Sequence, residues 1–302
     1  MDKAPHRPYG HNPMTRLADF RQVFAKAVVA RAGCPENQRL LHAFTRVERH
    51  HFLGPGPWTV CQDGTKTIDD DPAVVYQDMG IGLAPGIPTG LPSLHASLLH
   101  RARPESGDRV MQVGAGTGYF TAILAELVGP SGRVRAFEID EGLAATARTL
   151  LAAWPWVSVE ARSGVLRPDE PVDLLYVNAG VQLLPRSWIE ALAPDGRLVF
   201  PLVSSAGPGA VFLIRREAGT ICSARFLCRA GFVPCIGAQD EPASARLTEA
   251  LRTDDCHAVR SLRLAPAPPD ASCWFAGDGW WLSTYPVEEE NSPYRPHRGL
   301  TT

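Results

Sequence analysis

Residues 110–118 of this chain read Val-Met-Gln-Val-Gly-Ala-Gly-Thr-Gly, a short apolar run that ends in three closely spaced glycines. A run of helix-forming residues follows at once, from Tyr119 to Val128. This order predicts a buried strand, a tight turn and a helix, because glycine adopts the left-handed backbone that such a turn requires. It also predicts a ligand site, because a helix N-terminus presents backbone N–H groups to polar or anionic atoms.

An acidic residue stands where a nucleotide-binding fold needs one. A second apolar segment begins at Arg133 and ends in Glu138-Ile139-Asp140. In doubly wound sheets, an acid at the tip of the second strand holds the ribose of a bound nucleotide. The glycines and Glu138 together predict a site for an adenosine-containing ligand; the alternative is a glycine-rich turn that binds nothing.

The glycine spacing separates two kinds of adenosine ligand. The nicotinamide fingerprint places Gly or Ala three residues after its second glycine, where the helix approaches the strand closely. Here that position holds Tyr119, whose side chain is large. We therefore expect S-adenosylmethionine, which needs a turn for its amino-acid end and an acid for its ribose but no pyrophosphate cradle. The expected cofactor site comprises Gly114, Ala115, Gly116, Gly118, Tyr119, Glu138 and Ile139.

Composition limits the partners and the compartment. The chain has 302 residues, of which 45% are hydrophobic, and a formal net charge of −2. It can therefore bury a sizeable core, and it has no basic excess that would favour nucleic acid. The proline-rich N-terminus lacks an apolar signal segment, and no run of roughly 18 apolar residues predicts a membrane span. Seven scattered cysteines form no Cys-x-x-Cys pair, which indicates reduced thiols in a cytoplasmic protein and no metal site.

Apolar spacing predicts a doubly wound α/β fold. Residues 15–49 show helical spacing, residues 50–90 read as a functional loop region with short strands, and residues 91–103 read as a helix. From residue 110 strands and helices alternate, which predicts a parallel sheet with its ligand at the carboxyl ends of the strands. The expected strands are 110–113, 133–138, 156–160, 171–177, 197–202 and 210–215, and the expected helices are 119–128, 141–153 and 185–192.

The alternation fades after about residue 225. A strand is expected at 259–264, and Ala-Gly-Asp-Gly between residues 273–275 and 280–283 predicts a β-hairpin. Residues 288–302 read as a polar tail. The predicted organisation is an N-terminal helical and substrate-loop segment at 1–90, a cofactor-binding core at 91–224 and a small β-rich C-terminal extension at 225–302.

Several segments are similar to one enzyme family. Residues 110–125 resemble motif I of the protein-L-isoaspartate O-methyltransferases, and residues 195–201 resemble the family's Gly-Gly-Arg-Leu-x-x-Pro strand. Tyr76-Gln77-Asp78 resembles its Tyr-x-Asp, and Arg49-His50-His51-Phe52 resembles its Arg-His-x-Phe. The resemblance covers roughly residues 15–215. It implies a Rossmann-like methyltransferase sheet, S-adenosylmethionine as cofactor, and methyl transfer to a carboxylate or other oxygen acceptor.

The chain departs from that family in the loop that leads into the helix at 91–103. The family carries Thr-Ile-Ser-x-Pro there, with its serine at the reacting centre. In this chain Pro92 takes the proline position and Gly90 takes the serine position. Two hydroxyl side chains, Thr89 and Ser93, stand close by in the sequence.

Two further departures concern the cofactor. Gln112 replaces an acid that usually precedes the first Val/Ile-Gly of motif I, and Arg162-Ser163-Gly164 replaces the family's Gly-Asp-Gly. Ser163 can still accept a hydrogen bond from an adenine amine, although a hydroxyl binds it less tightly than a carboxylate does. Ser163 therefore joins the expected cofactor residues.

Thr89, Ser93 and His95 are the candidate catalytic residues. A carboxylate acceptor is ionised at pH 7 and needs no general base, whereas an amine or a phenol would be helped by one. His95 is the nearest candidate base. Its other interpretation, which we favour, is a histidine packed in the core or on the helix surface.

The sequence leaves three classes of function open. The first is an S-adenosylmethionine-dependent O-methyltransferase that acts on a peptide or small-molecule acceptor, and Gly90 in place of serine favours a divergent acceptor such as a natural product. The second is a protein that binds the cofactor without catalysis. The third, a nicotinamide oxidoreductase, is disfavoured by Tyr119.

Overall fold

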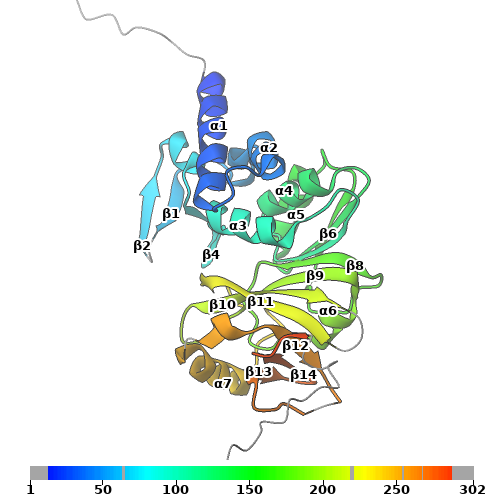
Figure 1. Cartoon of the computed structure of the whole chain (residues 1–302). Coiled ribbons are helices and arrows are strands. Elements are labelled where there is room, and N and C mark those ends of the chain that lie inside the picture. Colours follow the sequence, from blue (N-terminus) through cyan, green and yellow to red (C-terminus); the bar gives the residue numbers. More distant parts are fainter. Residues whose placement is uncertain (1–12, 63–64, 218–220, 254, 267, 288–302) are drawn as a thin grey trace, which may run out of the picture. The chain divides into compact units, whose positions relative to one another are not determined.

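The computed structural model describes most of the chain (Figure 1). The described residues are 13–62, 65–217, 221–253, 255–266 and 268–287. The polar segments predicted at the two ends lie largely or wholly outside these ranges.

Backbone contacts divide the chain into two units, Met1–His100 and Arg101–Thr302. The division falls inside helix α3 (Pro92–Ala102). The sequence places boundaries at 90/91 and 224/225 instead, and those boundaries stay predictions. Each unit is described by itself below.

The first unit begins with two helices and continues through short strands. Its elements are α1 (Pro13–Arg31), α2 (Gln38–Arg46), the 3-10 helix η1 (Arg49–Phe52), β1 (Trp58–Gln62), β2 (Thr65–Asp69), the 3-10 helix η2 (Pro72–Tyr76), β3 (Gly80–Ala84), β4 (Ile87–Pro88) and most of α3. The helices predicted within 15–49 and at 91–103 are confirmed. The four strands form one antiparallel sheet in the order β2-β1-β3-β4. Such short strands are stable only when paired, and their pairing could not be deduced from so little periodicity.

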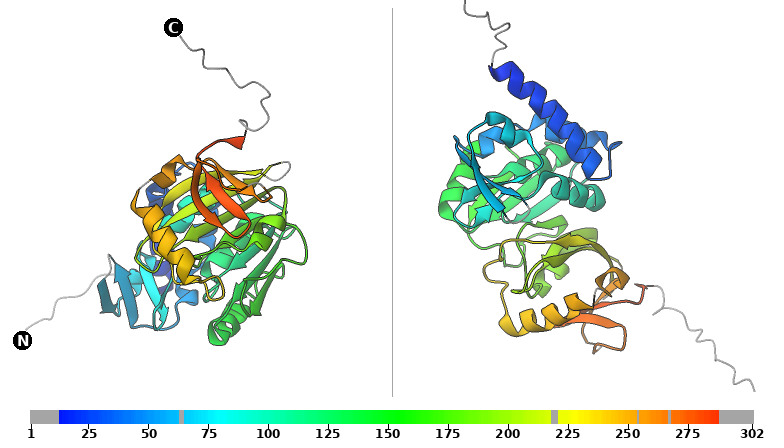
Figure 2. Two further views of the ribbon diagram at one scale, coloured as in Figure 1. Left: turned by 90° about the horizontal axis from the view of Figure 1, so that it is seen from below. Right: turned by 90° about the vertical axis from the view of Figure 1, so that its left-hand side faces the viewer.

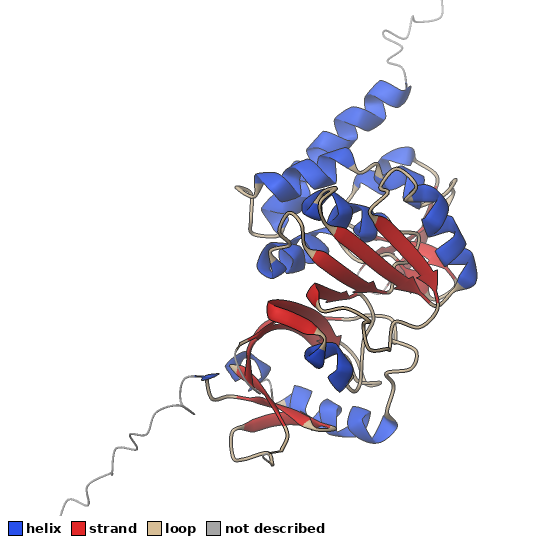
Figure 3. Cartoon of the chain, turned by 90° about the vertical axis from the view of Figure 1, so that its right-hand side faces the viewer, coloured by secondary structure: helices blue, strands red, loops and turns tan. Residues whose placement is uncertain are grey.

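The second unit contains the alternating strands and helices. Its elements are β5 (Arg109–Val113), α4 (Tyr119–Val128), β6 (Arg133–Glu138), α5 (Glu141–Leu150), β7 (Val157–Ala161), β8 (Val172–Val177), α6 (Arg186–Glu190), β9 (Leu192–Leu202), β10 (Gly209–Arg216), β11 (Ile221–Ala230), α7 (Glu241–Arg252), the 3-10 helix η3 (Asp255–Ala258), β12 (Ser261–Leu264), β13 (Cys273–Gly277) and β14 (Trp280–Ser283). Figure 3 distinguishes these strands from the helices between them.

One ten-stranded sheet runs through the second unit, in the order β13-β14-β12-β11-β10-β9-β8-β5-β6-β7. Strands β7, β6, β5, β8 and β9 are parallel, and the rest pair antiparallel. The chain starts at β5, builds outward to β7, and then returns to the other side of β5 with β8. This reversal of strand order lies between β5 and β8, where doubly wound sheets bind ligands at the carboxyl ends of their strands. The predicted α/β fold is confirmed.

Strand β9 begins earlier than predicted. The sequence analysis predicts it at 197–202. In the structure Leu192 already pairs with Val172 of β8, and the register then shifts. Asp195 absorbs that irregularity with a φ of 59°, so residues 194–196 lie within the strand as a local distortion.

The C-terminal region contains a helix that the sequence analysis missed. Helix α7 has Asp240 as its N-cap, which accepts the backbone N–H of Ala243, and a proline in its first turn. Leu247 and Leu251 are buried four residues apart on one face. Figure 2 shows α7 alongside the C-terminal strands. The N-cap, the proline and the leucine spacing are sequence signals for a helix. The helix was missed because this region was predicted to consist mainly of strands.

The predicted hairpin at 273–283 is confirmed, and its strands extend the main sheet rather than form a separate one. Trp280 is 1% exposed and donates its indole N–H to the Leu184 carbonyl at 3.0 Å. All seven cysteines are free thiols. Burial raises the pKa of Cys222 and of Cys235 to about 11, so both stay protonated at neutral pH and pack as small apolar groups.

Candidate active site

The loop between β5 and α4 has the backbone that its three glycines predicted. Gly114, Gly116 and Gly118 have φ values of 81°, 58° and 99°, all in the left-handed region that favours glycine. Position 118 also requires a residue without a side chain, because a Cβ there would lie 2.8 Å from Leu151 Cδ1. The glycine therefore allows the start of α4 to pack closely against the end of α5.

Glu138 is built into the same loop. It is 8% exposed. Its Oε2 accepts the backbone N–H of Gly116 at 2.7 Å, and its Oε1 accepts that of Asp140 at 3.0 Å. A carboxylate has about four lone-pair sites, so each oxygen keeps acceptor capacity for a further donor. Two oxygens facing a pair of hydroxyls is the geometry in which a carboxylate binds a ribose diol.

The amides at the start of the loop are already used by the protein. The N–H groups of Gly114 and Ala115 both donate to the Phe137 carbonyl, at 2.9 and 3.1 Å. They fix the loop to the end of β6, so these two N–H groups already have an acceptor within the protein. Among the other expected residues, Tyr119 is 3% exposed and packs against Phe120, whereas Ile139 is 43% exposed.

Ser163 follows β7, and its hydroxyl donates to the Ile236 carbonyl at 3.3 Å while accepting the Val165 N–H at 3.2 Å. The next residue, Gly164, lies against the ends of two other strands: a Cβ on it would be 2.7 Å from Val113 Cγ2. The loop after β7 therefore returns to the carboxyl ends of β5 and β6. Ser163 shapes that loop and retains one acceptor site.

Asn178 is a residue that the sequence analysis did not single out. It directly follows β8, and its backbone N–H donates to the Val113 carbonyl at 2.8 Å. A Cβ on Gly114 would meet its Cβ at 3.5 Å. Its side-chain Oδ1 is buried without a hydrogen-bond partner. The signal available in the sequence was its position, because a polar residue that ends the strand beside β5 lies at the reversal of strand order.

These features fit the predicted cofactor. Buried polar atoms normally have partners, yet Asn178 Oδ1 and both amide atoms of Gln112 on β5 have none in the protein. The spare acceptor sites of Glu138 and the Oδ1 atom of Asn178 are groups that could accept hydrogen bonds from the hydroxyl and amine functions of S-adenosylmethionine.

The candidate catalytic residues belong to one short segment of the first unit, residues 89–95. Thr89 Oγ1 accepts the Ile81 N–H at 2.9 Å, which ties the segment to β3. The Ser93 N–H donates to Asp78 Oδ1 at 2.8 Å, so Asp78 caps the start of α3. The Asp78 carboxylate is 6% exposed and also pairs with Arg31. The hydrogen bond from Ser93 and the ion pair with Arg31 give the aspartate of the Tyr-x-Asp segment a structural role.

Arg49 organises the backbone behind this segment. It is fully buried and donates to the carbonyls of Val75, Gln77 and Met79 at 2.9, 2.8 and 2.6 Å. A buried guanidinium is tolerated only when its N–H groups are satisfied. The arginine of the Arg-His-x-Phe segment therefore acts as a structural clamp.

His95 occupies the space beside Gly90. A Cβ built on Gly90 would lie 1.8 Å from His95 Nε2, so no side chain fits at position 90 while the imidazole stays there. His95 is 2% exposed, and burial lowers its pKa to about 3. It is therefore neutral at pH 7 and a weak proton acceptor.

Comparison with known proteins identifies the family. The model of the Protein-L-isoaspartate(D-aspartate) O-methyltransferase family matches residues 27–240. The chain belongs to this family. It is 33% identical to the protein-L-isoaspartate O-methyltransferase of Aeropyrum pernix over 63% of this chain and 71% of that protein. It is 30% identical to the enzyme of Methanopyrus kandleri over 70% of this chain and 90% of that protein.

Solved structures show the same fold. A protein-L-isoaspartate O-methyltransferase from Plasmodium falciparum in complex with S-adenosyl-L-homocysteine aligns with a TM-score of 0.59 at 17% identity, over 71% of this chain and 97% of that one. Another structure named protein-L-isoaspartate O-methyltransferase aligns with a TM-score of 0.59 at 18% identity, over 91% of this chain and 90% of that one. The expectation of an S-adenosylmethionine-dependent methyltransferase is confirmed. Within the part of the chain that the structure describes, no helix is long and apolar enough to cross a membrane.

Proposed function

We propose that the chain methylates a carboxylate oxygen of a peptide or small-molecule acceptor. The environment of His95 carries this proposal. Its buried, neutral imidazole, with a pKa of about 3, is too weak a base to take a proton from an amine or a phenol. Thr89 and Ser93 offer hydroxyls, which donate and accept hydrogen bonds but are not bases at neutral pH. A carboxylate is the acceptor that needs no base, because it is already ionised.

We assign the cofactor contacts to the second unit. Glu138 would hold the ribose hydroxyls, Ser163 the adenine amine, and Asn178 the amine of the methionyl end, with the glycine loop allowing the close approach. When bound, S-adenosylmethionine supplies a methyl group that its positive sulfur already activates. The protein's task is then to bind and orient, and to exclude water from the reacting atoms.

We assign the acceptor contact to the segment 89–95. Thr89 Oγ1 already accepts the Ile81 N–H, so its own hydrogen remains to be donated to a carboxylate oxygen. It would take over the role of the serine that Gly90 replaces. The imidazole beside Gly90 changes the shape of this segment, which favours an acceptor other than a plain isoaspartyl peptide.

A methyl-transfer assay with labelled S-adenosylmethionine tests the proposal. The acceptors are an isoaspartyl peptide, its aspartyl twin and a panel of small carboxylic acids, and cofactor binding is measured in parallel by calorimetry. Transfer to any carboxylate supports the proposal, and the preferred acceptor identifies the class. Cofactor binding without transfer to any member of the panel would favour a cofactor-binding protein without catalysis.

A further inference from the structure

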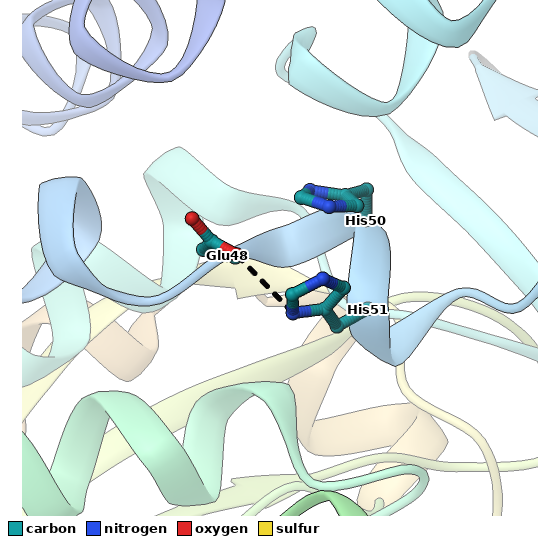
Figure 4. A group of neighbouring side chains, drawn as sticks. All are labelled: Glu48, His50 and His51. Carbon is teal, nitrogen blue, oxygen red and sulfur yellow. Dashed lines mark ion pairs between the residues drawn. The ribbon is translucent and has the colours of Figure 1, made fainter. Parts of the chain in front are cut away.

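A cluster of three potential metal ligands lies in the first unit, on and next to η1. Glu48, His50 and His51 each offer one ligand atom, and these atoms all lie within 4.8 Å of one another. Figure 4 shows the rings of His50 and His51 next to each other, with Glu48 facing His51. The ring centroids are 4.1 Å apart. None of these groups takes part in the methyl transfer described above.

The separations suit a single small cation. Bonds of about 2.0–2.1 Å from imidazole nitrogen and carboxylate oxygen to a tetrahedral metal place neighbouring ligand atoms roughly 3.4 Å apart. Glu48 Oε2 and His51 Nδ1 are already 3.3 Å apart. Closing the remaining separations requires side-chain shifts of about 1 Å, and the His51 side chain, 55% exposed, has room to make them.

Two further contacts position the ligands as metal sites require. His50 Nδ1 lies 2.7 Å from the Tyr76 hydroxyl, which orients the ring and leaves Nε2 as the coordinating atom. Metal-bound histidines usually have such a hydrogen bond on the other ring nitrogen. Glu48 Oε1 is held by the Arg21 guanidinium, which fixes the carboxylate and leaves Oε2 toward His51.

The ordinary ion pair between Glu48 and His51 accounts for those two residues alone. It does not account for the second imidazole, that of His50, whose ring centroid lies 4.1 Å from that of His51.

We propose that Glu48, His50 and His51 bind a divalent transition-metal ion of the zinc class. Two imidazoles and one carboxylate are a donor set for zinc, nickel, copper or ferrous iron, whereas calcium and magnesium prefer oxygen ligands alone. Three protein ligands leave at least one position for water. The ion would join η1 to its neighbours α1 and η2 through Arg21 and Tyr76. The sequence analysis predicted no metal site because it considered the spacing of the cysteines, whereas the ligands proposed here are two histidines and a glutamate.

Zinc titration of the full chain, followed by calorimetry, tests the site. The wild type is compared with Glu48→Gln, His50→Gln and His51→Gln. His42→Gln, which replaces an exposed histidine on α2, is the matched control. We expect each ligand variant to weaken zinc binding at least tenfold and the control to leave it unchanged. Tyr76→Phe should weaken it about tenfold or less, since outer partners typically contribute 10–100-fold.

Cobalt substitution gives a readout that is independent of affinity. Co²⁺ bound in a low-symmetry nitrogen and oxygen site shows visible absorption bands that the hydrated ion lacks. The proposal predicts these bands in the wild type and in His42→Gln, and their loss in His50→Gln. Zinc binding that is equal in the wild type and in a His50→Gln/His51→Gln double variant would overturn it. So would a cobalt spectrum that does not change between them.

Discussion

The glycine loop of the second unit and the segment 89–95 of the first unit differ in how much of their structure can be predicted from the sequence. In the loop, three glycines with left-handed backbone and one acid form the cofactor site that we propose, and all are visible in the sequence. In the segment, the decisive fact is that the imidazole of His95 lies where a side chain of Gly90 would be. Backbone-shaped sites can be predicted from local sequence, whereas sites shaped by packing depend on contacts that the local sequence does not reveal.

The largest effect is expected from Glu138→Ala. The substitution removes the acceptor for two backbone N–H groups and for the ribose hydroxyls. Two hydrogen bonds to a charged group, each of about 1.5 kcal/mol, correspond to a roughly 100-fold rise in the Kd for S-adenosylmethionine. Calorimetry measures it, with Glu141→Ala, an exposed acid three residues later, as control. An unchanged Kd would show that Glu138 serves the loop alone.

The second prediction concerns the packing of the segment 89–95. Gly90→Ser places a side chain against a buried imidazole, and overpacking of this kind costs roughly 1–3 kcal/mol. In the double variant Gly90→Ser/His95→Ala the hydroxyl gains room, so we expect part of the loss to be recovered relative to the sum of the single variants. Denaturant unfolding of the four proteins gives the coupling. If the losses in the free energy of unfolding of the two single variants simply added up in the double variant, this would contradict a close contact between position 90 and the His95 side chain.

The third prediction is a pH dependence that belongs to the first unit. The pKa of His95 is lowered from 6.5 to about 3 by burial, so protonation favours the unfolded chain. Its contribution to stability is complete above about pH 6.5 and falls by about 1.4 kcal/mol for each pH unit from there toward pH 3. His95→Gln should flatten this slope, whereas His42→Gln should not. If the free energy of unfolding changed with pH equally in the wild type and in His95→Gln, the prediction would be contradicted. His95 would then take up protons in the folded state as readily as in the unfolded chain.

The smallest effect is expected from Asn178→Ala. Because Asn178 Oδ1 has no partner in the protein, its loss should leave the free energy of unfolding nearly unchanged. One hydrogen bond to an amine is worth about 1–1.5 kcal/mol, which predicts a roughly tenfold rise in the Kd for the cofactor. A fall in stability with an unchanged Kd would assign Asn178 to the fold and not to the site.

The sequence was most informative where structure follows from short-range rules. Strand β5, the glycine turn, α4 and Glu138 were all predicted, because apolar periodicity and glycine conformation are local properties. Helix α7 was missed, although its N-cap Asp240 and its leucine spacing are local signals for a helix. Strand β9 begins five residues earlier than predicted, because Leu192 already pairs with Val172 of β8.

The remaining features depend on long-range contacts. Asn178 and Gly114 are far apart in sequence, and their proximity follows from the pairing of β5 with β8. Thr89, Ser93 and His95 were identified as candidates, and a histidine packed in the core or on the helix surface was the favoured interpretation of His95. The structure buries His95, and its proximity to Gly90 follows from the fold and not from the local sequence. His50 and His51 were noted as part of Arg49-His50-His51-Phe52, but their grouping with Glu48 was not predicted, because a potential metal site depends on how side chains are oriented around η1.

The most direct test of the account is the chemical nature of the methylated product. A methyl ester of a carboxylate is hydrolysed by mild alkali and releases its label as volatile methanol, whereas methyl groups on amines or phenols stay bound. We predict that the label transferred by this enzyme, from S-adenosylmethionine to its best acceptor, is released as methanol at alkaline pH. Label that stays on the acceptor after alkali would contradict a carboxylate acceptor and would require a base that the neutral His95 does not provide.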